Sequence, residues 1–126
     1  DLNNYLFEEL EDNFDIFEYF DQQFNELSKS DLEITLIPFV SKIENILQVK
    51  LKEDERIGLL IHMTSLIDRL TKKQGPVVYF NVAEIIEKYP GQVEKIKQAL
   101  LPIESYFNIS IGDGDAATIA RIILKC

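Results

Sequence analysis

The chain has 126 residues, 22 of them acidic and 13 basic, which gives a formal net charge of −9 at pH 7. This length suits one domain with a single core. Such a chain is a poor ligand for nucleic acid or an anionic membrane, because both attract basic surfaces, and no apolar run approaches the roughly 18 residues that a membrane span needs. With one histidine and one cysteine, we expect no disulfide framework, no hydrolytic triad, and no bound metal or other cofactor.

The negative charge is concentrated at the N-terminus. Residues 1–28 contain nine acidic residues and no basic one, whereas the rest of the chain has 13 of each. Residues 3–27 are predicted to form an acidic amphipathic helix, because apolar residues recur at i, i+3, i+7 and i+10: Phe17, Phe20, Phe24 and Leu27. The favoured interpretation is a first helix that docks this stripe on the core, and the alternative is a tail that recruits a protein partner. We assign residues 1–30 to this acidic helix or linker and residues 31–126 to the main domain.

Two long helices are predicted next. Asp31 is a candidate N-cap for a helix that reaches about Gln48, with Pro38 kinking or delaying it. The following helix, over residues 53–73, carries acidic residues at its start and basic residues at its end, which matches the helix dipole. Gly75-Pro76 is expected to stop it.

Three shorter helical segments follow. Asn81 and Glu84 resemble a capping box at the start of a short helix that ends at Tyr89-Pro90. A further helix is marked by apolar residues at helical spacing: Val93, Ile96, Leu100 and Ile103. After a turn at residues 108–113, Asp115 is predicted to cap the last helix. The sequence therefore predicts an all-α fold, a single compact bundle of five or six helices without an internal repeat.

The only histidine, His62, lies within the predicted helix over residues 53–73. Arg69 follows seven residues later, two turns along the same helix face and roughly 10 Å away by rise. A neutral imidazole is a nucleophile and nearby cations hold phosphoryl oxygens, so His62 is a candidate phosphoacceptor, with Arg69 and Arg56 as the assisting cations. A lone histidine on an apolar helix is, however, more often a structural side chain. Spacing alone leaves both interpretations open.

Residues 56–69 and several later segments of the sequence resemble a known family. His62-Met63-Thr64-Ser65-Leu66-Ile67-Asp68-Arg69, preceded by Arg56-Ile57-Gly58-Leu59, is similar to the PTS regulation domain (PRD) of bacterial transcriptional regulators. Later cues follow in the family's order: Tyr89-Pro90, Leu100-Leu101-Pro102-Ile103-Glu104 and Phe107-Asn108-Ile109-Ser110-Ile111. The resemblance spans roughly residues 31–124 and is strongest to the C-terminal PRD of LevR- and ManR-type activators, which are sigma-54-dependent regulators of sugar uptake.

The resemblance implies a helical domain without catalytic activity of its own, phosphorylated on histidine by the sugar phosphotransferase system. His62 falls on the first family histidine, and phosphate there would modulate the dimerisation and activity of the parent activator. The implied partners are a second copy of the domain, in a homodimer, and the phosphocarrier HPr or an enzyme IIB as the donor. Many such domains carry a second histidine in the last helix, where this chain has Ile122, which speaks against a two-site mechanism. We expect the chain to be a cytoplasmic segment of a longer regulator.

Two hypotheses for function follow. The preferred one is a regulatory phosphoacceptor domain, and the alternative is a helical protein–protein interaction module with a structural, non-phosphorylated histidine. A small helical enzyme has little support, because no second general acid or base is obviously paired with His62. The burial of His62 separates the first two. An enclosed, hydrogen-bonded ring favours the structural role, whereas a ring nitrogen exposed at a groove favours phosphorylation.

Overall fold

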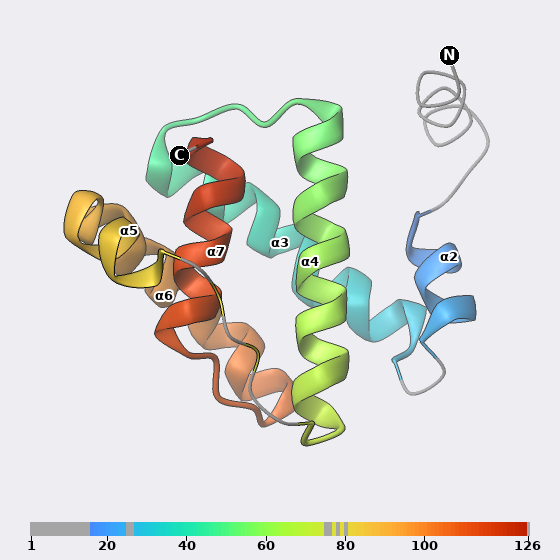
Figure 1. The fold of residues 1–126 in the computed structure, drawn as a ribbon. Coiled ribbons are helices and arrows are strands. Elements are labelled where there is room, and N and C mark those ends of the chain that lie inside the picture. The colour runs from blue at the N-terminus through green and yellow to red at the C-terminus, as the bar shows by residue number, and fades with distance from the viewer. Residues whose placement is uncertain (1–15, 25–26, 75–76, 78, 80, 126) are drawn as a thin grey trace, which may run out of the picture.

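Figure 1 shows the computed structural model of the chain, in which residues 16–24, 27–74, 77, 79 and 81–125 are described. Over these residues the chain forms six helices and no strand: α2 (Ile16–Gln23), α3 (Lys29–Leu47), α4 (Glu53–Thr71), α5 (Val82–Lys88), α6 (Pro90–Phe107) and α7 (Asp113–Leu124). The predicted all-α bundle is confirmed for this part of the chain. None of these helices combines the length and the apolar character that crossing a bilayer requires.

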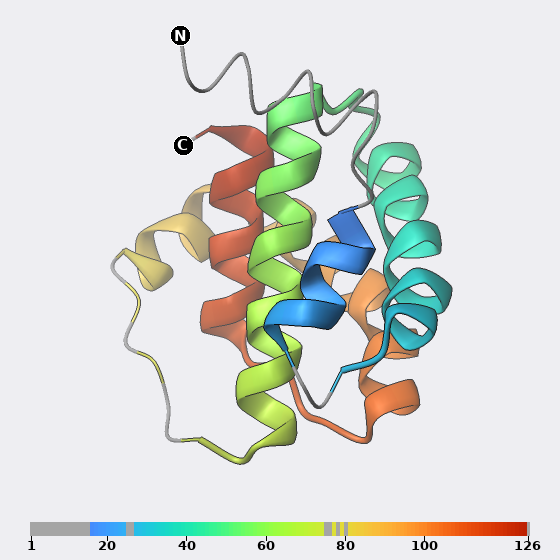
Figure 2. The same cartoon turned by 90° about the vertical axis from the view of Figure 1, so that its right-hand side faces the viewer.

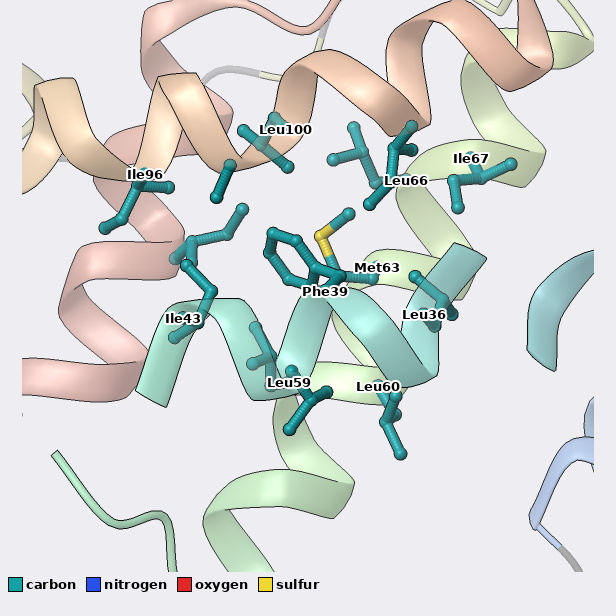
Figure 3. Packing of buried hydrophobic residues seen from close by; sticks show 14 of the residues in the cluster. Leu36, Phe39, Ile43, Leu59, Leu60, Met63, Leu66, Ile67, Ile96 and Leu100 are labelled. Carbon is teal, nitrogen blue, oxygen red and sulfur yellow. The ribbon is translucent and has the colours of Figure 1, made fainter. Parts of the chain in front are cut away.

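The four long helices enclose one apolar core. α3 packs on α6, α6 on α7 and α7 on α4, while α2 contacts α3, and α5 contacts α6 and α7. α2 and α5 therefore flank the bundle on opposite sides, as the two views show (Figures 1 and 2). Figure 3 shows side chains of α3, α4 and α6 directed toward one another, with Phe39 and Met63 at the centre of the cluster.

The N-terminal apolar stripe docks on the core in its described part, as the favoured interpretation predicts. Phe17, Phe20 and Leu27 are buried in the same cluster as the long helices, and Phe24 packs against it. The Phe20 ring meets the rings of both Phe17 and Phe24 edge to face. Burial of apolar surface, at about 25 cal/mol per Å², favours turning this stripe inward. Residues 3–15, 25 and 26 of the predicted helix lie outside the described residues, and α2 ends at Gln23, before the predicted end at Leu27.

Three helix starts differ from the predicted caps. Ser28 caps α3 in place of Asp31, because its Oγ accepts a hydrogen bond of 3.1 Å from the Asp31 N–H. Asn81 precedes α5 in the left-handed region, at φ 61°, and its side chain makes no cap hydrogen bond. Gly112 precedes α7, so that Asp115 lies in the first turn of that helix and not before it. The cap residue depends on where the chain turns into the helix, which residue type alone does not fix.

Two prolines lie inside long helices. Pro38 is within α3, which already begins at Lys29 and is not delayed, and Pro102 is within α6. Each proline lacks the N–H that an α-helix uses, so each helix lacks one backbone hydrogen bond there. The neighbouring side chains Phe39 and Ile103 are buried, and burial at about 1.5–3 kcal/mol each helps to offset that loss.

The helix pairs α3–α4 and α6–α7 share local structure at an offset of 60 residues. The Glu44 carboxylate near the end of α3 accepts a hydrogen bond of 2.8 Å from the Leu51 N–H. The Glu104 carboxylate near the end of α6 accepts one of 2.7 Å from the Ile111 N–H. The chain thus uses the same hydrogen bond to turn from α3 into α4 and from α6 into α7.

The same offset relates the first turns of α4 and α7. Glu55 is the third residue of α4 and Asp115 the third of α7. Glu55 pairs with Lys125 just after α7, and Asp115 pairs with Arg69 near the end of α4, with a nitrogen–oxygen distance of 3.0 Å in both pairs. α4 and α7 are thus antiparallel neighbours that are joined by an ion pair at each end (Figure 1).

Candidate phosphoacceptor site

His62 lies at the boundary between the core face of α4 and solvent. The next two residues along the helix, Met63 and Thr64, are fully buried. The His62 side chain itself is half-buried. The apolar side chains of α4 therefore fix the helix, and the imidazole is held at its edge by a rigid element.

The imidazole lines an open pocket of about 210 Å³ between α4, α7 and the segment before α5. Seven residues form the pocket: His62, Ser65, Leu66, Arg69, Val77, Tyr79 and Thr118. Sequence spacing predicted that His62 and Arg69 share one face of a helix, and the structure brings both into this pocket. A nucleophilic ring, a cation and three hydroxyl side chains thus meet in one hollow.

Neither ring nitrogen of His62 makes a hydrogen bond to the described part of the chain. Nε2 is enclosed and without a partner, and Nδ1 is not enclosed in this way. Burial is the largest cause that lowers the pKa of His62 below the 6.5 of a free imidazole; the Asp115 carboxylate opposes this shift and the Arg69 guanidinium adds to it. The ring is therefore mainly neutral at pH 7, and no described residue hydrogen-bonds to its lone pair.

A buried carboxylate holds Arg69. Its Nη2 lies 3.0 Å from Oδ1 of Asp115, and the two side chains are only 14% and 10% exposed. The same Asp115 oxygen accepts a hydrogen bond of 2.6 Å from the Tyr79 hydroxyl. Burial, together with this bond to Asp115, raises the pKa of Tyr79. The bond to Asp115 thus fixes the guanidinium in place, and an arginine has five N–H donors, more than this one bond uses.

Sequence reasoning missed Asp115 and Tyr79 as site residues. Asp115 is 46 residues from Arg69 and 36 from Tyr79, so no local spacing relates them. One signal was present: Asp115 shares a helical stripe with Ile119 and Ile122, which places a carboxylate on the inward face of the last helix. A charge on an apolar face usually has a buried partner.

Gly114 allows Tyr79 to approach α7. A Cβ atom at this position would lie 3.0 Å from Cδ2 of the Tyr79 ring, which is closer than side-chain carbons pack. The ring can therefore lie against the first turn of α7 and reach the next residue, Asp115, with its hydroxyl.

Arg56, the second predicted phosphate-assisting cation, does not line the pocket. It pairs with Glu53, one turn earlier in α4. It also precedes His62 by six residues, whereas Arg69 follows it, so the two arginines lie toward opposite ends of the helix. Among the residues that the structure describes, Arg69 is the cation that lines the pocket with His62.

One family comparison covers the part of the chain that contains the site. The PRD domain model covers residues 38–125, which is more than half of the chain and includes His62, Arg69 and Asp115. Neither a curated protein sequence nor a solved structure matches the chain. PRD domains are regulatory, typically non-catalytic domains of bacterial regulators that the phosphotransferase system controls. The chain belongs to the PRD family.

Proposed function

We propose that this PRD domain is phosphorylated on His62 by the sugar phosphotransferase system and so modulates the regulator that contains it. The observation that carries the proposal is the pocket, in which a neutral imidazole without a hydrogen-bond partner among the described residues lies beside Arg69. A histidine retained only for packing would be expected to have its ring nitrogens hydrogen-bonded, and the His62 ring has no such bond within the described residues.

The chemistry is a transfer between two imidazoles. A ring nitrogen of His62 attacks the phosphorus of a donor phosphohistidine, the new P–N bond forms as the old one breaks, and the donor imidazole keeps the electron pair of the broken bond. Arg69 donates hydrogen bonds to the phosphoryl oxygens and balances their charge. The Ser65 hydroxyl, which lines the same pocket, is a further donor.

The donor in this proposal is HPr or an enzyme IIB, and the parent protein is a LevR- or ManR-type sigma-54-dependent activator. Both assignments come from the sequence resemblance. Phosphorylation by either donor needs no catalytic residue in this chain, because the donor protein carries the activated phosphoryl group.

We also propose that the domain forms a homodimer whose association constant depends on phosphorylation. Large apolar side chains that are 47–57% exposed on α3 and α6 support self-association: Ile34, Ile37, Leu101 and Tyr106. A phosphoryl group adds about two negative charges, which changes the electrostatics of any face near it. Sedimentation of both forms over a concentration series tests this, and a monomer in both forms would contradict it.

The central experiment is phosphorylation of the purified domain with phosphoenolpyruvate, enzyme I, HPr and candidate enzyme IIB proteins, followed by intact mass. We expect one phosphoryl group that is lost in acid, as phosphoramidates are. The His62→Ala and His62→Gln variants should remain unlabelled while keeping the helical circular dichroism of the wild type. Labelling of a folded His62 variant would place the phosphate elsewhere. A wild type that no donor labels would leave the interaction module with a structural histidine as the better description.

A further inference from the structure

We propose that Asp115 is a positioning residue for phosphoryl transfer, because its carboxylate holds the Arg69 guanidinium in the pocket beside His62. The inference rests on the proposed function of His62 and deepens it. Asp115 acts through Arg69 and does not touch the reacting atoms.

The carboxylate makes two bonds that converge from different elements. Asp115 is 7% exposed, and its Oδ1 accepts one hydrogen bond from Arg69 on α4 and one from Tyr79 in the segment before α5. An arginine side chain is long and has many rotamers, so without a partner it would spread over many positions. The bond to Asp115 selects one position in which the guanidinium lines the pocket.

Linking the helices does not by itself account for this buried pair. α4 and α7 are already joined at their other ends by Glu55 and Lys125. They also bury apolar side chains, such as Ile119, against the shared core. Burying two charges carries a desolvation cost that apolar residues in the same place would avoid. The pair is therefore better explained by the geometry that it imposes on Arg69, next to the only histidine of the chain.

Charge and geometry act in opposite directions at Asp115. The negative charge repels an incoming phosphoryl group, whereas the hydrogen bond places Arg69 where it can receive one. Asp115→Asn keeps an acceptor oxygen and removes the charge, and Asp115→Ala removes both. A positioning role predicts that the Asp115→Asn variant keeps most of the wild-type transfer rate and that the Asp115→Ala variant does not.

The test is a double-mutant cycle on the rate of His62 labelling per folded molecule, with the protein donors or with phosphoramidate as a chemical donor. Asp115→Ala should slow labelling by about tenfold or more, since small displacements of a positioning group have such effects. Adding Asp115→Ala to Arg69→Gln should cause no further loss. Asp115→Asn should stay within about threefold of the wild type, a spread that one imperfect hydrogen bond allows.

The matched control is Asp113→Ala, because Asp113 lies two residues earlier in α7 and forms an exposed pair with Lys97 at 2.9 Å. This variant should label at the wild-type rate. Wild-type labelling of Asp115→Ala would overturn the proposal. So would a double variant whose loss equals the product of the two single losses, because Asp115 would then act independently of Arg69.

A second readout needs no donor. The single histidine gives an unambiguous NMR titration, and Asp115 raises the pKa of His62 while Arg69 lowers it. If Asp115 holds Arg69, Asp115→Ala removes both influences, and the double variant with Arg69→Gln has the same His62 pKa. A higher pKa in the double variant would show that Arg69 had stayed in place without Asp115 and would overturn the proposal. If no donor labels the wild type, the proposed function fails, and this titration still decides whether Asp115 positions Arg69.

Discussion

The two ends of the α4–α7 pair follow the same plan in different surroundings. At each end, the third residue of one helix pairs with a cation at the far end of the other: Glu55 with Lys125 and Asp115 with Arg69. The Lys125 side chain is 60% exposed, whereas that of Arg69 is 14% exposed. An exposed lysine keeps its freedom and its water, so its pair contributes little and fixes little, whereas a buried arginine pair has a defined geometry. We call the Glu55–Lys125 end the tether end, because its pair only links the two helices. We call the Asp115–Arg69 end the pocket end, because Arg69 lines the pocket.

The histidine distinguishes the two ends further. His62 lines the pocket at the buried end, and the residue at the corresponding position in α7 is Ile122. The surroundings of His62 keep its ring neutral and provide Arg69 beside it. If the proposed function holds, the pocket and Arg69 are what should set His62 apart from Ile122 as a phosphoacceptor.

The largest expected effect separates the two cations. Arg69→Gln should slow His62 labelling by about a hundredfold, which is typical for loss of one preorganised donor to a developing charge. Lys125→Gln, at the tether end, should label at the wild-type rate. Initial rates from intact mass test both variants. Equal rates for the two would show that Arg69 has no special role at the pocket.

The next effect is on stability. Asp115→Ala leaves the buried Arg69 without its carboxylate, which should lower the free energy of unfolding by about 3 kcal/mol or more. Lys125→Ala removes a 60% exposed cation and leaves Glu55 its hydrogen bond from the Lys52 N–H, so it should lower the free energy of unfolding by less than about 1 kcal/mol. Urea titrations followed by circular dichroism measure both changes. Similar losses for the two variants would contradict the distinction between tether and buried pair.

The pH dependence of stability near pH 6.5 should reflect the pocket end. Because the pKa of His62 is lowered in the folded domain, the unfolded chain binds the proton more readily below about pH 6.5. The free energy of unfolding should therefore fall as the pH drops through 6.5, and this contribution is complete below the folded pKa. His62→Gln should remove this component of the pH profile. An identical profile for wild type and variant would show that the His62 pKa is unshifted.

The smallest expected effect is that a histidine placed in α7 gains no phosphorylation. Placing a histidine at the corresponding position of α7, as Ile122→His in a His62→Ala background, should give no labelling because Arg69 lies at the other end of the helix pair. Intact mass after incubation with the same donors decides the matter. Labelling of this variant would mean that position within the helix pair suffices.

The sequence by itself determined the local features of this protein. The helical period placed His62 and Arg69 on one face, and α4 runs over Glu53–Thr71 where residues 53–73 were predicted. The inward turn of Phe17 and Phe20 also followed from periodicity. These predictions succeed because backbone hydrogen bonds repeat every few residues and fix which side chains share a face.

Only the tertiary structure decided what stands around His62. Asp115, predicted as a cap, is the partner of Arg69, and Tyr79 also bonds to it. Arg56 pairs with Glu53 and lies outside the pocket. Contacts between residues 36 and 46 positions apart depend on how α7 and the segment before α5 pack on α4. That packing is set by the whole core, and no spacing within one helix encodes it.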